Sequence, residues 1–325
     1  MFNRTFTQSL LALCFILTPF LLFSNNSTTT QVDFFDKSSC SKKEKYCKGK
    51  RTYKDGSVYV GEFRYGEPHG NGRLDWPEGD YYVGQFQDGV RHGYGEQHHA
   101  NGDIYEGEFM FGFMHGKGIY SWGNGAEYAG YFAEDFMSGE GIFEAANGER
   151  YDGRWKKSQA DGQGVFTLVD GTRYLGKFKQ GDRHGAGVVT WRTGDVLNGK
   201  WKKGLLSGKG SFQFTNGDEY QGVWGEGQLE GKSVYVCNNG KRYEGNLVAI
   251  ERQLKKDQHL WEAAKQNVGL AWYAIGLEYK ANKQFRKAKT TLLNAQQYIP
   301  ASSDLNKLIH QQLEIIEQKI KKHQS

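Results

Sequence analysis

The chain lacks a strong excess of charge of one sign. Its 42 lysines and arginines oppose 37 aspartates and glutamates, which leaves a formal net charge of +5 over 325 residues. Proteins that bind nucleic acids normally show a larger basic excess, because each phosphate contact needs a cationic side chain. Nucleic acid is therefore not expected as a partner.

Motifs of catalysis and of cofactor binding are also missing. The Gly-x-Gly pairs, as at residues 162–164, precede neither a helix nor Lys-Ser/Thr, so they do not form phosphate-binding loops. No Ser, His and Asp stand in a strand–turn–helix context. Glu62, Glu106 and Glu108 alternate with apolar residues, as on the solvent face of a strand, rather than forming a glycosidase pair. No catalytic site, cofactor or metal site is predicted, and the chain is expected not to be an enzyme.

What the sequence does contain is a 23-residue period between residues 59 and 243. Each unit has a tyrosine, a glycine two residues later and a Phe or Trp two residues after that. A Gly-x-Gly pair and an Asn-Gly or Asp-Gly turn follow. Leu197 replaces one tyrosine, and Ser233 replaces one glycine of a pair. The predicted repeat core consists of Tyr59, Phe63, Tyr82, Phe86, Tyr105, Phe109, Tyr128, Phe132, Tyr151, Trp155, Tyr174, Phe178, Trp201, Tyr220 and Trp224.

One unit is predicted to be a short strand, a loop, a second strand and a tight turn. Alternation places the tyrosine, the glycine and the second aromatic residue on one face. The glycine leaves room for a ring over the backbone. Because a lone hairpin is marginally stable in water, stacking on neighbours stabilises the array. The predicted fold class is mainly β, an elongated antiparallel β-meander followed by a small α-helical segment and preceded by an N-terminal hydrophobic signal or anchor.

The unit Tyr-x-Gly-x-Phe, six residues, Gly-x-Gly resembles the MORN repeat. Residues 105–109 and 115–118 lie close to its consensus, and eight full units fill residues 59–242 within an array expected over residues 47–247. The resemblance implies a single long meander with a right-handed twist, about 80–90 Å long at ~4.8 Å per strand. It also implies a non-enzymatic role in organising assemblies. Some members dimerise through their last units, so a homodimer is one expected partner state.

Residues 1–23 are predicted to be a signal peptide or a membrane anchor. Residues 10–23 are apolar apart from Thr18, which is the length of a signal-peptide core and short for a membrane span of about 20 residues. The sequence after Phe23 offers no A-x-A cleavage site, so a cleaved signal and an uncleaved anchor both stay open. Either implies membrane association through residues 10–23 and a body that is exported or anchored, most favourably outside the cytoplasm.

Residues 24–46 are expected to form a polar tether that ends in a segment rich in lysine and cysteine. With an export signal upstream, Cys40 and Cys47 are predicted to form a disulfide. It would close the exposed edge at the start of the sheet. A metal site would need more Cys or His nearby. The basic residues after residue 37 favour the opposite, cytoplasmic orientation under the positive-inside rule; we favour export.

Residues 248–325 lose the glycines and take on helical periodicity. Residues 269–302 resemble one tetratricopeptide repeat, through Trp272, Ile275, Gly276, Tyr279, Ala288, Ala295 and Pro300. One such unit cannot form a long groove, and the alternative is a helical hairpin packed over the final strand. A further helix is expected over residues 249–266. Ile309, Leu313, Ile316 and Ile320 form an apolar stripe on a last helix.

Two sets of residues are candidates for binding. Four apolar loop residues stand where other units carry polar ones, and they are predicted to contact a protein partner if exposed: Phe111, Phe113, Phe136 and Leu206. Four lysines are candidates for anionic phospholipid, against the alternative of a mixed solvated face: Lys156, Lys157, Lys202 and Lys203. The predicted function is a non-catalytic scaffold for protein–protein interaction at or beyond a membrane. The alternative is an anionic-phospholipid-binding module.

Overall fold

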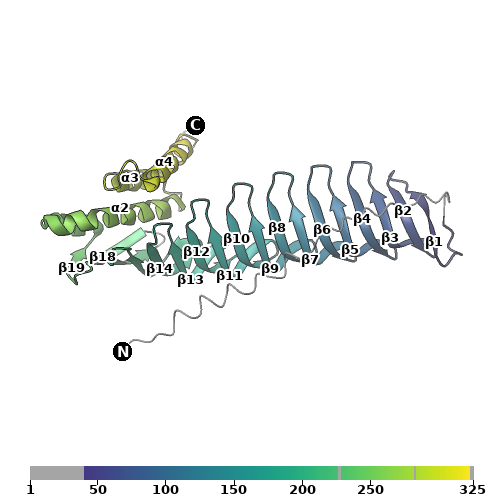
Figure 1. The fold of residues 1–325 in the computed structure, drawn as a ribbon, viewed down its shortest axis with the longest axis horizontal. Coiled ribbons are helices and arrows are strands. Elements are labelled where there is room, and N and C mark those ends of the chain that lie inside the picture. The colour runs from purple at the N-terminus through teal and green to yellow at the C-terminus, as the bar shows by residue number, and fades with distance from the viewer. Residues whose placement is uncertain (1–39, 226–227, 282, 323–325) are drawn as a thin grey trace, which may run out of the picture.

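The structure, a computed structural model, describes residues 40–225, 228–281 and 283–322. They form one long antiparallel sheet with helices at its C-terminal end (Figure 1). The predicted signal or anchor of residues 1–23 lies outside the described residues, as does the tether up to residue 39.

The strands of the described residues are β1 (Cys47–Thr52), β2 (Val58–Arg64), β3 (Glu67–Asp75), β4 (Tyr81–Gln87), β5 (Val90–His98), β6 (Ile104–Met110), β7 (Phe113–Ser121), β8 (Glu127–Ala133), β9 (Phe136–Glu144), β10 (Arg150–Lys156), β11 (Gln159–Thr167), β12 (Arg173–Lys179), β13 (Asp182–Thr190), β14 (Val196–Lys202), β15 (Leu205–Leu206), β16 (Gly208–Gln213), β17 (Glu219–Gly225), β18 (Gln228–Val236) and β19 (Arg242–Gly245).

Each strand pairs antiparallel with the next one along the chain. β1 pairs with β2, β2 with β3, and so on to β18 with β19; β15 and β16 both pair with β14 as two parts of one interrupted strand. The sheet is therefore an open meander in chain order, and this prediction is confirmed. Figure 1 shows the hairpins side by side along the length of the sheet.

In six units, those of Tyr59, Tyr82, Tyr105, Tyr128, Tyr151 and Tyr174, the tyrosine ring lies over a glycine pair. Tyr105 is fully buried, and a Cβ on Gly118 would stand 2.5 Å from its ring. Its hydroxyl donates to the carbonyl oxygen of Glu108 at 2.9 Å. The same bond, from the tyrosine to the carbonyl three residues later, recurs in the units of Tyr59, Tyr82, Tyr128, Tyr151 and Tyr174. Since burial raises the pKa of Tyr151 and Tyr174 to about 12, these hydroxyls stay neutral donors at physiological pH.

Tyrosines and Phe or Trp rings form a continuous ladder from Tyr59 to Trp201 on this face. Tyr105 meets Phe109 of its own unit and Phe132 of the next unit edge to face, each at 5.0 Å between ring centroids. Such pairs contribute about 0.5–1.5 kcal/mol beyond the area they bury. All the predicted repeat-core residues are buried here except Trp155, which is partly buried against them. We call this side of the sheet the aromatic face.

The helices are α1 (Leu247–Leu254), α2 (Gln258–Ala281), α3 (Phe285–Gln296) and α4 (Asp304–Lys322). The helix expected over residues 249–266 does not exist as such, because the chain turns after Leu254 and α2 continues past residue 266. Asp257 sets the new start, since its carboxylate accepts the N–H of Leu260 at 3.2 Å. The stripe of Ile309, Leu313 and Ile316 is buried on α4. The tetratricopeptide resemblance stays a prediction.

Helices α1 and α2 cover the aromatic face of the last strands. Ile250, Leu254 and Val268 are fully buried and share one core with Trp224 and Tyr235. Figure 1 shows α2 lying along the sheet near β18.

A buried polar junction fixes the position of α2. The Asn267 side-chain amide donates to the Asp218 carboxylate at 2.9 Å and approaches the Tyr235 hydroxyl at 3.0 Å. The Tyr235 hydroxyl in turn donates to Asp218 at 2.6 Å. Burial, followed by the bond to Asp218, raises the pKa of Tyr235. Because a polar group buried without partners is costly, this network favours one register of α2 on the sheet.

The contact between tyrosine and glycine is tested by two alanine substitutions. Gly118→Ala would place a methyl group against the Tyr105 ring, whereas Gly112→Ala, at φ 88°, meets no atom within 4 Å. The second change costs only left-handed strain, about 1–2 kcal/mol, and the first is expected to cost about 3 kcal/mol through overpacking. Urea unfolding checks the ranking, and equal losses would contradict the packing argument.

Candidate interaction surfaces

Seven two-residue turns follow the first strands of successive units and lie along one long edge of the sheet. Both central residues have positive φ in Tyr65-Gly66, Asp88-Gly89, Phe111-Gly112, Glu134-Asp135, Lys157-Ser158, Gln180-Gly181 and Lys203-Gly204. This is the type I′ geometry that matches the twist of a hairpin. A meander returns every first strand to the same edge, so these turns form a row, about 10 Å apart. We call this row the rim.

Two rim turns lack the usual glycine, yet they keep its conformation. Asp135 has φ 67° and Ser158 has φ 59°. The Asp135 carboxylate accepts the N–H of Met114 at 2.7 Å, and the Ser158 hydroxyl accepts the N–H of Met137 at 3.1 Å. These bonds to the preceding unit offset the strain of a side chain at positive φ.

Aromatic side chains project from the rim at β6–β9. Phe111 is 70 % exposed, Phe113 49 % and Phe136 48 %. Met110, opposite Phe113 in the register, is also exposed. Phe113 and Phe136 begin β7 and β9, two strands apart, so the side chains are close enough for one partner to contact them together. We call Met110, Phe111, Phe113 and Phe136 the aromatic rim patch.

Leu206 does not belong to this patch, and its prediction as an exposed contact residue is wrong. Its side chain is fully buried. Leu206 pairs with Trp201 on the aromatic face, and a Cβ on Gly199 would stand 2.4 Å from its side chain. In this unit Leu197 replaces the tyrosine, so no ring covers the glycine and Leu206 fills the space instead. The missing tyrosine was the sequence signal for this inward turn.

The four candidate lysines lie on the same rim, beyond the aromatic patch. Lys156 and Lys157 stand at the turn after β10, and Lys202 and Lys203 at the turn after β14. All four are exposed, as is Lys179 on the turn between them. The Glu134–Asp135 turn lies between the Phe111 turn and the Lys157 turn. The sequence presented the aromatic and basic sets as unrelated, and the structure places both on one edge.

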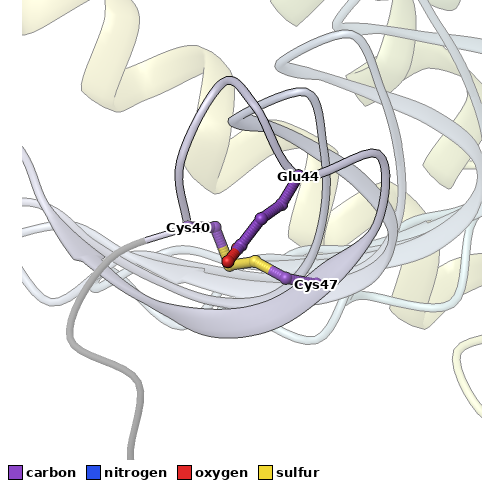
Figure 2. A group of neighbouring side chains, drawn as sticks. All are labelled: Cys40, Glu44 and Cys47. Atoms are coloured by element: carbon purple, nitrogen blue, oxygen red, sulfur yellow. A yellow bond between two sulfur atoms is a disulfide. The ribbon is translucent and has the colours of Figure 1, made fainter.

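The first end of the array is closed by a disulfide between Cys40 and Cys47, whose Cα atoms are 6.1 Å apart. The predicted disulfide is thus present. Figure 2 shows the Glu44 side chain directed at the two sulfur atoms. Ligand atoms of these three residues lie within 4.8 Å of one another. Zinc binds thiolates, so a metal site here would require the disulfide to be reduced first.

The disulfide loop also covers the first hairpin. The N–H of Tyr65 donates to the carbonyl oxygen of Glu44 at 3.2 Å. Cys40 is buried in the same core cluster as Tyr59 and Phe63. The loop therefore shields the end of the aromatic ladder, as a terminal cap of a repeat array must.

The repeats now place the chain in a family. A family model for the MORN repeat matches residues 59–81, 82–104, 105–127, 128–150, 151–173, 174–196, 198–219 and 220–242. The chain belongs to the MORN-repeat family. Its eight matched units are the eight predicted from the 23-residue period. No curated protein matches the chain.

Solved structures show distant similarity to this MORN-repeat protein. The TCP10 domain of CPAP from Danio rerio is 12% identical, with 60% of this chain and 96% of that chain covered and a TM-score of 0.35. The SAS-4 TCP domain from Drosophila melanogaster, solved in complex with a proline-rich motif of Ana2, is 14% identical. The match covers 61% of this chain and 89% of that chain, with a TM-score of 0.25. A streptogramin B lyase is 13% identical, and the match covers 61% of this chain and 67% of that chain with a TM-score of 0.14. None of the three informs the function.

No helix among the described residues is long and apolar enough to cross a membrane.

Reduction of the disulfide is expected to loosen the first end of the array and nothing else. In the chain-entropy treatment, opening a loop of this size costs about 2.5 kcal/mol. Amide hydrogen exchange should therefore accelerate in β1 and β2 after addition of a reductant, while β8 and β9 serve as the internal control. Unchanged exchange in β1 would show that the loop is held by other contacts.

Proposed function

We propose that this MORN-repeat protein is a non-catalytic scaffold that binds a protein partner through the aromatic rim patch. The observation that carries the proposal is the exposure of three phenylalanine rings on adjacent rigid turns. Water-exposed apolar clusters of this kind are typical of interaction sites. The turns are held by the sheet on both sides, so little side-chain and loop ordering is needed on binding.

Phe111 supports the proposal by its unfavourable conformation. It has φ 53°, where bulky residues are outliers, and its ring is mostly in water. Equivalent turn positions hold Asp88 and Gln180, so the turn itself does not need a ring. A strained and exposed aromatic side chain that the fold does not use favours a role in binding.

The proposal extends to the two ends of the chain. Residues 10–23 would deliver the protein to a membrane or hold it there. The disulfide favours a body outside the cytoplasm, because disulfides persist in oxidising compartments. The helical segment, with its tetratricopeptide-like sequence, would recruit a second partner or cap the array.

Binding of anionic phospholipid is the second candidate. Five exposed lysines lie on the rim, and each basic side chain near an anionic surface contributes about 1 kcal/mol. The neighbouring phenylalanine rings are apolar and could enter the boundary between headgroups and acyl chains, as Phe does in helices that bind membrane surfaces. The rim as a whole would then lie edge-on against the membrane.

Replacement of Phe111 separates binding from stability. Phe111→Asn puts a residue that tolerates positive φ into the turn, so the free energy of unfolding should rise by up to about 1 kcal/mol. Partner capture should fall in the same variant. Gln180→Asn, at the equivalent position of another unit, is the matched control and should change neither quantity much. A variant that is less stable would contradict the strain argument.

Two multiple variants distinguish a protein partner from lipid. Quantitative capture from native membranes should be lost with Phe111→Ser, Phe113→Ser and Phe136→Ser together, and kept when Lys156, Lys157, Lys202 and Lys203 are changed to Glu. Flotation of residues 40–325 with anionic vesicles across a salt series tests the second candidate. Salt-sensitive flotation that the lysine variant abolishes would make lipid recognition the function. Capture that survives loss of the three rings would overturn the scaffold proposal.

A further inference from the structure

The side of the sheet opposite the aromatic face carries an apolar row. The helices pack on the aromatic face, which leaves this side, here called the open face, uncovered by them. Along its middle, the strand register places six apolar side chains next to one another from β7 to β13, interrupted only by Asp152 on β10: Ile119, Ala129, Ile142, Val165, Leu175 and Val188. Ile119 is 38% and Leu175 49% exposed. The solvated face of a sheet is normally polar.

Charges on the open face separate into two halves on either side of β10. The open-face charges of β5–β9 are acidic apart from Lys117: Glu96, Glu106, Glu108, Glu127, Glu140 and Glu144. Those of β10–β16 are mostly basic, with nine cationic side chains against Asp152, Asp161 and Asp182: Arg150, Arg154, Lys156, Arg173, Lys177, Lys179, Lys200, Lys202 and Lys209. Asp152 is itself paired with Arg150 at 3.1 Å. Although the whole chain has a net charge of only +5, the open face is therefore dipolar, with an acidic half at β5–β9 and a basic half at β10–β16.

We propose that the open face binds a second copy of this chain, with the two arrays antiparallel. A two-fold axis parallel to the strands and passing over β10 brings each strand against the one equally far on the other side of β10. Because the axis preserves position along the strands, each row of side chains that runs across the sheet faces the same row of the second copy. The apolar row then meets the apolar row, Ile119 against Val188 and Ala129 against Leu175.

Away from the axis, the same operation pairs opposite charges, whereas Arg150, Asp152 and Arg154 on β10 meet their own copies. Glu127 on β8 faces Arg173 on β12 of the second copy, and Glu108 on β6 faces Lys200 on β14. A two-fold axis along the array would instead set acidic half against acidic half. Because like-charge contacts across an interface cost several kcal/mol, the charge pattern selects the antiparallel arrangement. An interface related by a two-fold axis must be self-complementary in this way.

The size of the patch predicts a weak dimer. Six strand spacings of ~4.8 Å make the apolar row about 29 Å long, and the flanking charged rows bring its width to about 20 Å. Each copy would bury about 600 Å², or about 1,200 Å² in total, at the lower limit for specific interfaces. Since the charged rows lie at the border of the patch, salt should weaken the association. The apolar row and the two charged rows beside it lie nearer the middle of the strands than the rim turns, so this inference does not depend on the proposed function.

A charge-swap cycle tests the dimer. The full-length chain, purified in a non-ionic detergent, is examined by sedimentation equilibrium over a range of protein and salt concentrations. Glu127→Arg and Arg173→Glu each create two like-charge contacts, so each should weaken self-association about tenfold or more. An equimolar mixture of the two variants restores both contacts, as does the double variant, and should dimerise like the wild type. Leu175→Asp should abolish dimers by placing a charge in the apolar row.

The controls separate this surface from others. Lys157→Glu with Lys203→Glu changes the charge of two rim turns and should leave association unchanged. A monomeric wild-type chain at low salt would overturn the proposal. So would dimers that persist in Leu175→Asp and in both single charge variants, since they would have to form through another surface, such as residues 10–23 or the last units.

Discussion

The contact of each tyrosine ring with the glycine pair beneath it is the constraint on which the rest of the structure depends. The ring occupies the space where a Cβ would stand on either glycine. Its hydroxyl ties it to the carbonyl three residues on, and its edge meets the Phe or Trp of the next unit. One side chain thus shapes its own hairpin and bonds it to its neighbour. Because both contacts recur in register, the 23-residue period runs without an insertion from residue 59 to residue 243.

A core built on one side of a single sheet leaves two other surfaces without a packing role. Rim turns need only a conformation, which Asp88, Phe111 and Lys157 all adopt. Open-face positions need only a residue compatible with a strand. Sequence differences between units therefore concentrate on the rim and the open face. These two surfaces, rather than the repeated motif, carry the residues that would recognise partners.

The periodic pattern was sufficient to predict the meander, the buried rings and the turns, because strand alternation fixes which residues share a face. It failed where one position depends on another far away. Leu206 turns inward only because Leu197 lacks a ring, a compensation that needs the register of β14. The break between α1 and α2 is by contrast a local feature, since Asp257 caps the N–H of Leu260, and helical periodicity alone does not reveal it. The common edge of the phenylalanines and lysines follows from the topology and not from their spacing alone.

The two surfaces are also linked by geometry. A two-fold axis parallel to the strands inverts the direction of the array but keeps the ends of the strands where they are. Both rims of an antiparallel pair would then lie on the same side. The aromatic rim patch of one copy, at β6–β9, would stand beside the lysines of the other copy, which follow β10, β12 and β14. A partner or a membrane that meets this edge would find two copies of each feature within reach at once. Weak contacts presented in this way gain affinity through effective concentration, so a weak dimer on the open face is sufficient to strengthen binding at the rim.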